Sequence, residues 1–288
     1  MRVATLTKYN LVDYNLSKIT NDLNRASQIV SSGKRINTLS DDPAGLSHSL
    51  GLKSTLANID QLNRNIELGE SWLVASEGAL QHTQNLVTEA KVLCIQMASD
   101  SNSAVDRQSA VAVVQNIRDE IVSLANTQIS GRYIFSGTET DVKPFELDGT
   151  YNGNDIPFAI RAGNDSLVQI GSDGEAIFAD IFTTLDDLGT ALQSDDVDAI
   201  NTAMTELDLH AERVSTKISD VGSKMNRMEV KKNILADLSI STTERLSEIE
   251  DADFVEATMN LKSVEMAYQA ALASSASIME LSLVDFLR

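Results

Sequence analysis

The feature that most limits what this chain can fold into is a narrow apolar stripe that recurs along most of its length. Between Tyr9 and Val30, apolar residues return at alternating intervals of three and four, which places them on one face of a helix. Similar spacing recurs in residues 52–97, 200–228 and 254–278. Helix propensity alone is too weak to keep such a segment folded in water. We therefore expect long helices that pack against one another or against other molecules.

The first and last stripes lie at opposite ends of the chain. Each is apolar along one narrow face, so neither arm should stay helical by itself. Three outcomes are open: the arms pair with each other, they pair with other subunits, or they remain disordered until they assemble. The positions predicted to carry these contacts are Tyr9, Val12, Leu16, Ile19 and Leu23 in the first arm, and Leu261, Val264, Tyr268, Ile278 and Phe286 in the last.

Residues 131–178 differ from the helical segments around them. They contain seven of the 14 glycines, two of the three prolines and six of the 13 aromatic residues. Short β-favouring runs such as RYIFSG and IPFAIRAGND are separated by turn residues. The expected fold class is therefore mainly α with a small β-rich insert (α+β). Further helices are predicted over about 104–129 and 177–193.

The segment VSSGKRINTLSDDPAGL (residues 30–46) lies between two of these helices. Gly33 suits the left-handed conformation that ends a helix, and Asp42, followed by proline, suits the start of the next one. A phosphate-binding P-loop would need GxxxxGK[ST], and here the first glycine and the Ser or Thr are missing. The segment is therefore interpreted as a joint between two helices. Its candidates for contact with a neighbouring subunit are Arg35 and Asp42.

Charge and composition exclude several classes of function. The net charge is −19 at pH 7; residues 1–40 carry six basic and two acidic residues, a net of +4, which leaves −23 for the rest. Such a surface repels nucleic acid and anionic membranes, so neither is an expected partner. No apolar run approaches the roughly 18 residues of a membrane span, and the N-terminus lacks the apolar core of a cleaved signal peptide. These features suggest a soluble cytoplasmic protein and leave open export without a cleaved signal.

No grouping of residues in the sequence resembles an active site or a metal site. His48, His82 and His210 are far apart and lack the HxxxH spacing of a zinc site. Cys94 is the only cysteine and lies on an apolar stripe, where cysteine usually packs as a small hydrophobic residue. The segment 148–159 matches a calcium-binding loop only in part, because the bidentate glutamate is missing. We expect no catalytic residue, no cofactor and no metal.

Two segments resemble the terminal motifs of a known family. SSGKRINTLSDDPAGLSHS (residues 31–49) resembles the N-terminal motif of bacterial flagellins, in which SSG, Arg-Ile-Asn and Asp-Asp-x-Ala-Gly follow a coiled helix. SEIEDADFVEATMNLKSVEMAYQAALASSASIMELSLVDFLR (residues 247–288) resembles their C-terminal motif. The middle, with GRYIFSGT (131–138) and YNGND (151–155), and the ending LSLVDFLR are similar to the hook–filament junction members of this family more than to its filament subunits.

The resemblance implies a structural subunit of the bacterial flagellum, exported by the flagellar type III apparatus and located outside the cell at the hook–filament junction. The implied partners are a preceding hook-associated protein, flagellin, further copies of this chain in a ring or short helical layer, and a cytoplasmic export chaperone. The implied fold is an elongated rod of long antiparallel helices with paired terminal coiled-coil arms. In that arrangement the chain would divide into a terminal coiled coil that is disordered in the monomer (1–40 plus 250–288), a helical rod (41–130 plus 185–249) and a small β-rich outer domain (131–184).

Two alternatives fit many of the same sequence features. A filament flagellin shares the terminal motifs, and it would differ by growing long filaments on seeds. A cytoplasmic coiled-coil scaffold or signalling protein shares the long apolar stripes, and it would differ by staying inside the cell. An enzyme is the weakest alternative, because the sequence offers no catalytic constellation.

Overall fold

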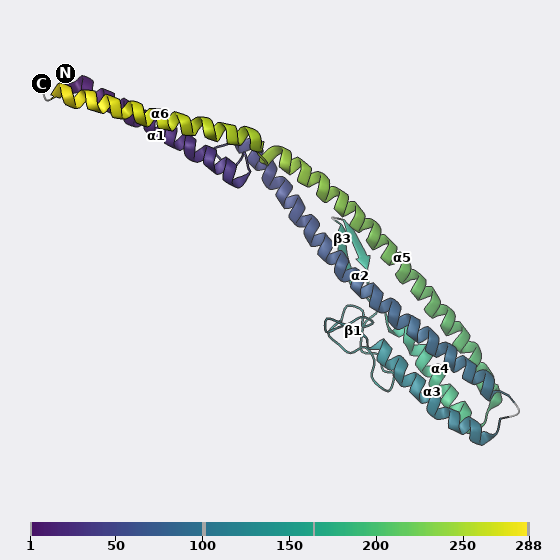
Figure 1. Ribbon diagram of the computed structural model, residues 1–288. Coiled ribbons are helices and arrows are strands. Elements are labelled where there is room, and N and C mark those ends of the chain that lie inside the picture. Colours follow the sequence, from purple (N-terminus) through teal and green to yellow (C-terminus); the bar gives the residue numbers. More distant parts are fainter. Residues whose placement is uncertain (1, 100–101, 164, 287–288) are drawn as a thin grey trace. The chain divides into compact units, whose positions relative to one another are not determined.

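The computed structural model describes residues 2–99, 102–163 and 165–286, with side chains in the same ranges except at 2–6, 8 and 278–286 (Figure 1). The helices are α1 (Arg2–Ser32), α2 (Pro43–Met97), α3 (Ala104–Ala125), α4 (Asp180–Ser194), α5 (Val197–Glu250) and α6 (Phe254–Phe286), with a π-helical turn, η1 (Glu175–Ala179), before α4. The strands are β1 (Gln128–Ile129), β2 (Arg132–Tyr133), β3 (Ala159–Gly163) and β4 (Ser166–Gln169). The predicted fold class, mainly α with a small β-rich insert, is confirmed.

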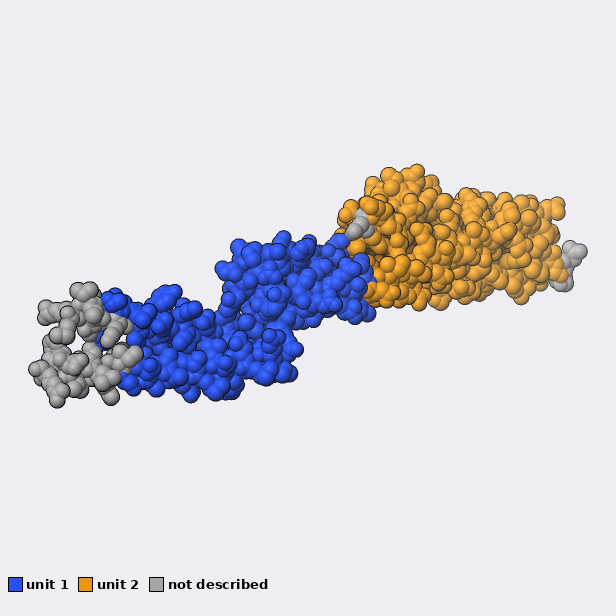
Figure 2. Space-filling model, turned by 90° about the horizontal axis from the view of Figure 1, so that it is seen from above, with its two compact units in different colours: residues 1–58, 238–288 blue, residues 59–237 orange. Residues whose placement is uncertain are grey.

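The chain packs as two compact units, which Figure 2 colours separately. Unit 1 comprises residues 1–58 and 238–288, and unit 2 comprises residues 59–237. Helices α2 and α5 each contribute one end to unit 1 and the remainder to unit 2. The β-rich insert belongs to unit 2. The division into terminal coiled coil, helical rod and outer domain concerns roles in an assembly, and it stays a prediction.

In unit 1, α1 and α6 lie side by side and run in opposite directions (Figure 1). Each helix buries a small residue, Ala26 on α1 and Ala257 on α6. The predicted stripe positions around them are half-buried: Val12, Leu16, Ile19, Leu23, Leu261, Val264 and Tyr268. The two arms therefore pair with each other, and this pairing covers only part of their apolar stripes.

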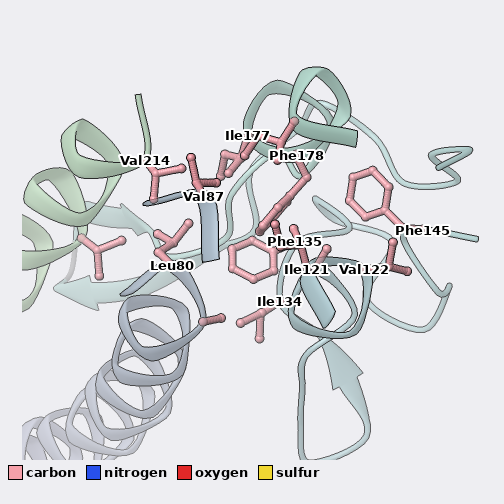
Figure 3. Packing of buried hydrophobic residues seen from close by; sticks show 14 of the residues in the cluster. Leu80, Val87, Ile121, Val122, Ile134, Phe135, Phe145, Ile177, Phe178 and Val214 are labelled. Atoms are coloured by element: carbon pink, nitrogen blue, oxygen red, sulfur yellow. The ribbon is translucent and has the colours of Figure 1, made fainter. Parts of the chain in front are cut away.

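The core of unit 2 is built on two rows of residues that repeat every seven positions. The ion pairs Lys91–Asp208 and Glu70–Lys232 join α2 to α5 and show that the two helices run antiparallel. Figure 3 shows part of the packing between them. All ten residues of the two rows are at most 2% exposed: Ile66, Leu73, Leu80, Val87 and Cys94 on α2, and Ile200, Leu207, Val214, Val221 and Met228 on α5.

Polar and small residues also repeat every seven positions along α2. Ser76 and Thr83 are fully buried, and their hydroxyls donate to the carbonyl oxygens of Trp72 and Ala79 at 2.9 and 2.8 Å. Because these groups are satisfied within their own helix, their burial costs little. Gly69 leaves room for the β-rich insert, since a Cβ there would lie 2.5 Å from Cδ1 of Ile160.

The β-rich insert is held together by aromatic rings as well as strands. Phe135, Phe145, Phe178 and Phe182 make edge-to-face contacts with ring centroids 5.0–5.8 Å apart, part of which Figure 3 shows. Strands β3 and β4 pair antiparallel, β1 pairs antiparallel with β2, and both sheets have two strands. The insert therefore joins the helical core through its rings and the buried side of the β3–β4 hairpin.

The first predicted β run is mostly turn. Of the residues in RYIFSG, only 132–133 form a strand. Gly137 adopts a φ of +69°, and a Cβ there would lie 2.2 Å from the carbonyl oxygen of Asn154. The chain turns at this glycine toward the 151–155 segment, so it cannot continue as an extended strand.

Two helix boundaries also differ from those predicted. Helix α3 ends at Ala125 instead of about 129. The side-chain amide of Asn126 donates to the carbonyl oxygen of Phe145 at 2.9 Å, and its oxygen accepts the N–H of Phe145 at 3.0 Å. These two hydrogen bonds fix Asn126 at the end of α3, and the helix does not continue beyond it. The helix predicted from 177 begins earlier, with the π-helical turn η1.

Candidate functional site

Chemistry-bearing side chains do not gather into a site in the part of the chain that the structure describes. There, no cluster of His, Cys, Asp or Glu could hold a metal ion, and no helix is long and apolar enough to cross a membrane. Burial raises the pKa of Cys94 to about 11, which keeps its thiol protonated at neutral pH. His210, on α5, is buried, and its Nε2 lies 2.9 Å from Oγ1 of Thr184. His48 and His82 lie on α2 and are exposed. The features that remain are surfaces and the joint.

The joint, defined as residues 33–42, connects α1 to α2 within unit 1. Gly33 has a φ of +69° and donates its N–H to the carbonyl oxygen of Ile29 at 2.9 Å, which ends α1. Asp42 caps α2, because its Oδ1 accepts the N–H of Gly45 at 2.8 Å and Pro43 is the first helical residue. Both helix ends are the predicted ones.

The joint is paired with the connection between α5 and α6. Lys34 and Asp251 form an antiparallel bridge. The N–H of Arg35 donates to the carbonyl oxygen of Glu250 at 2.7 Å, and the N–H of Ala252 donates to that of Gly33 at 2.9 Å. Two short segments from opposite ends of the chain are thereby fixed to each other by their backbones.

Glu250 is the most buried charged group at this junction, with a side chain only 6% exposed. Its Oε1 accepts hydrogen bonds from the ammonium groups of Lys53 at 2.7 Å and Lys34 at 3.2 Å, and its Oε2 accepts one from the hydroxyl of Ser49 at 3.4 Å. Burial acts to raise the pKa of Glu250, but the hydrogen bonds from the two lysines outweigh it and hold the pKa below the ordinary value. One carboxylate thus ties together the joint, α2 and α5.

The turn inside the joint is ordered by Asp41. One of its oxygens accepts the N–H groups of Thr38 at 2.8 Å and Asn37 at 3.0 Å, and the other pairs with Arg25 of α1 at 2.7 Å. The two backbone hydrogen bonds lower the pKa of Asp41. Ile36, between these groups in sequence, is 2% exposed. The joint is therefore a structured turn with its own small apolar contact.

Arg35 and Asp42, the predicted contacts to a neighbouring subunit, both have partners within the chain. Arg35 donates from Nη2 to the carbonyl oxygen of Ile249 at 2.8 Å, and its Nη1 lies 3.8 Å from Oδ2 of Asp42. The Arg35 side chain is nevertheless 54% exposed. Contact between these residues and another subunit stays a prediction.

Part of each terminal helix presents apolar residues to solvent. On α1, Leu11 and Tyr14 are 59% and 68% exposed, and Tyr9, a predicted contact, is 36% exposed. On α6, Met259 and Met266 are both 64% exposed. The backbone of α6 continues through the predicted contacts Ile278 and Phe286, whose side chains lie outside the described residues.

Sequence reasoning did not find these residues. Leu11, Tyr14, Met259 and Met266 fall between the positions of the narrow stripes, so the stripe pattern does not mark them. Glu250 belongs to the acidic run of residues 248–253, and nothing in that run marks it as the buried carboxylate. The basic residues that bury it, Lys34 and Lys53, are about 200 positions away in sequence, and no local pattern indicates that pairing.

Comparison with known proteins agrees with this architecture. Residues 3–140 match the model of the bacterial flagellin N-terminal helical region, and residues 197–287 match that of the bacterial flagellin C-terminal helical region. The chain is 25% identical to flagellar hook-associated protein 3 of Escherichia coli K12 over 98% of both chains. It is 31% identical to polar flagellin F of Vibrio parahaemolyticus over 54% of this chain and 41% of that protein. The crystal structure of Bacillus cereus FlgL is similar, with a TM-score of 0.62 and 28% identity, over 68% of this chain and 99% of that chain.

Long paired helices with flagellin motifs at both ends define the class: this chain belongs to the bacterial flagellin family. Within that family it is a structural component of the bacterial flagellum.

Proposed function

We propose that this chain is a subunit of the hook–filament junction, where it connects a preceding hook-associated protein to the first flagellin subunits. Its role is structural and involves no catalysis. Copies of the chain assemble outside the cell into a ring or a short helical layer. Export proceeds through the flagellar type III apparatus without a cleaved signal peptide, and a cytoplasmic chaperone binds the chain before export.

The observation that carries this proposal is the end-to-end correspondence with flagellar hook-associated protein 3, which covers 98% of both chains. The match to a filament protein, polar flagellin F, covers only 41% of that protein. The flagellar filament 30.7 kDa core protein of Treponema maltophilum is also similar, at 24% identity over 84% of its length. The growth of filaments on seeds, tested below, therefore separates the junction role from a filament role.

The uncovered apolar residues of unit 1 support assembly with other subunits. Tyr14 on α1 and Met259 and Met266 on α6 are each more than 60% exposed. Exposed apolar side chains that line a helix favour burial against a partner. If α1 of one copy meets α6 of the next, the contact is heterologous, and heterologous contacts either close into a ring or continue as a helix.

We further propose that helices α1 and α6 are largely disordered in the free chain and become ordered on assembly, while the joint keeps its hydrogen bonds to residues 250–252. Fixing the backbone costs about 1–2 kcal/mol per residue, and the half-buried stripes of α1 and α6 offset this only in part until neighbours cover the rest. Amide hydrogen exchange on a verified monomer tests this directly. We expect weak protection in residues 5–30, and strong protection there would contradict the proposal.

Deletion of the gene tests the junction role. We expect non-motile cells that keep their hooks and release unpolymerised flagellin into the medium. A filament subunit would instead give long filaments when the purified protein is added to seeds. Normal filaments on the deletion strain would overturn the proposed function.

A further inference from the structure

One leucine of the joint is left in solvent although the joint already has its own apolar contact. Ile36 makes that contact and is 2% exposed, whereas Leu39, three residues later, is 65% exposed. Leu39 lies in a turn whose backbone is fixed by hydrogen bonds to Asp41. A large apolar side chain held on a rigid turn loses little conformational freedom when it enters a partner, which favours binding.

Unit 1 also contains a hollow of about 420 Å³ between the start of α2 and the end of α5. Leu52 and Ile249 provide apolar lining, Gly51 contributes no side chain, and Arg245 and Glu248 provide charge. A cavity of about 150 Å³ is enough for a benzene ring, so this space, called here the Gly51 hollow, admits an aliphatic side chain.

Gly51 has no evident role within its own chain. It lies inside α2, where glycine weakens a helix, and a Cβ added to it would meet nothing within 4 Å. No close packing among the described residues therefore requires a glycine at this position. Close approach of another molecule to the helix backbone is a physical reason for one.

The charges of the two surfaces are complementary. Arg245 and Glu248 line the hollow, and neither forms an ion pair within the described chain. Beside Leu39, Arg35 and Asp42 are 3.8 Å apart, which is a loose ion pair with an exposed guanidinium. Nη2 of Arg35 donates to the carbonyl oxygen of Ile249 and Oδ1 of Asp42 caps α2, so the loosely paired atoms of the joint are Nη1 of Arg35 and Oδ2 of Asp42. Each surface thus offers one cationic and one anionic group for a further contact.

We propose that Leu39 of one copy of this chain inserts into the Gly51 hollow of a second copy, with Asp42 facing Arg245 and Arg35 facing Glu248 of that copy. This inference rests on the proposed function, because it names the partner that the joint meets in the assembly. The two surfaces differ, so a contact that each copy makes once passes from copy to copy in one direction, and it either closes into a ring or continues as a helix.

Cross-linking between two single-cysteine variants tests the contact. Cells that lack the native gene express Leu39→Cys and Gly51→Cys together, and their isolated flagella are treated with a mild oxidant. Both positions are exposed, and the native Cys94 is buried. The matched control replaces Gly51→Cys by Leu50→Cys, because Leu50 is 57% exposed but points about 100° away around the same helix.

We expect roughly tenfold more disulfide-linked dimer from the Leu39→Cys and Gly51→Cys pair than from the control pair, because a disulfide needs Cα atoms within about 7 Å. Equal yields from both pairs, with the variants present in the flagella, would overturn the inference and leave the proposed function standing. Cross-links from Leu39→Cys to a different flagellar protein would overturn it as well, since the occupant would not be a second copy. Absence of the wild-type chain from flagella would overturn the proposed function and this inference together.

A second variant addresses the case in which a cysteine alters assembly. Leu39→Asp should lower incorporation of the chain into flagella roughly tenfold or more, because the free energy gained by burying the leucine side chain in the partner is lost. Leu50→Asp should leave incorporation unchanged. Equal incorporation of the two variants would contradict insertion of Leu39 into a partner.

Discussion

The two units of this protein use the same helical repeat with different degrees of burial. In unit 2, the repeating residues of α2 and α5 are at most 2% exposed. In unit 1, the stripes of α1 and α6 are half-buried, and Met259 and Met266 are 64% exposed. The difference arises because α3, α4 and the β-rich insert share one core with the α2–α5 pair, whereas the described parts of α1 and α6 pack against each other, with the joint as an added neighbour at one end. A periodic stripe therefore defines a contact face, and the number of neighbours decides how completely that face is buried.

The largest expected change in the free energy of unfolding comes from truncating one buried leucine in unit 2, and the same truncation in unit 1 is the comparison. Leu80→Ala in unit 2 should lower the free energy of unfolding by about 2–5 kcal/mol, because Leu80 is fully buried and leaves a cavity. Leu16→Ala, at a half-buried position in unit 1, should leave unit 2 unaffected. Trp72 is the only tryptophan and is buried in unit 2, so its fluorescence in a urea titration reports that unit alone. Equal shifts in the two titrations would contradict the comparison.

An intermediate effect is expected at the junction of the joint with α5. Glu250→Gln removes the charge that Lys34 and Lys53 share, and should weaken the joint by about 1–2 kcal/mol, a value reduced because both lysines are about 40% exposed. The measurement is amide exchange at Arg35 and Ala252, whose N–H groups bond across the joint. Glu248→Gln, two residues away and exposed, is the matched control and should change neither amide. Similar exchange in both variants would argue against a role for the buried carboxylate.

Acid should open the joint. The pKa of Glu250 is lowered in the folded chain, because its hydrogen bonds to the two lysines outweigh the effect of burial. Its contribution is therefore complete above the unfolded pKa of about 4.3 and is lost as pH falls through the folded value. Below about pH 4 we expect the NMR signals of the Arg35 and Ala252 amides to move toward unfolded positions. The pKa of Asp41 is also lowered, so acid acts there in the same sense. Glu250→Gln should remove only part of the pH dependence, and an unchanged profile in that variant would refute the assignment to Glu250.

The smallest effect on stability is expected on the uncovered face of α6. Met266→Ser should change the stability of the free chain by no more than about 0.5 kcal/mol, because the side chain is already 64% exposed. It should nonetheless lower incorporation into flagella, since that face is proposed to meet another subunit. Asn260→Ser, at an exposed polar position about 120° away around the same helix, is the control. Equal incorporation of both variants would show that the face of Met266 stays in solvent.

The long helices could be predicted because their signals are local. The stripes of 52–97 and 200–228, the helix stop at Gly33 and the cap at Asp42 depend on residues within one or two turns of each other. The helix end near Ala125 could not be predicted in this way, because Asn126 bonds to Phe145, almost 20 residues later. The same reason applies to RYIFSG, whose turn at Gly137 is dictated by contact with Asn154.

The candidate site was predictable only in part. The joint and its two helix ends follow from the sequence, and so do the half-buried stripe positions of α1 and α6. The pairing of the joint with 250–252 does not, because hydrogen bonds between backbones leave no residue signature. Exposure of Leu39 beside buried Ile36 depends on how one turn is folded, and hydropathy does not distinguish an isoleucine and a leucine three positions apart.

The rows of unit 2 restrict how this protein can change in length. From Ile66 to Cys94 and from Ile200 to Met228 the buried residues recur every seven positions. A single inserted residue would turn everything beyond it by about 100° around the helix axis and bring the row out of the core. Length can therefore vary in steps of seven residues, made in α2 and α5 together. Such a step keeps both rows in register with each other and with the face that they bury.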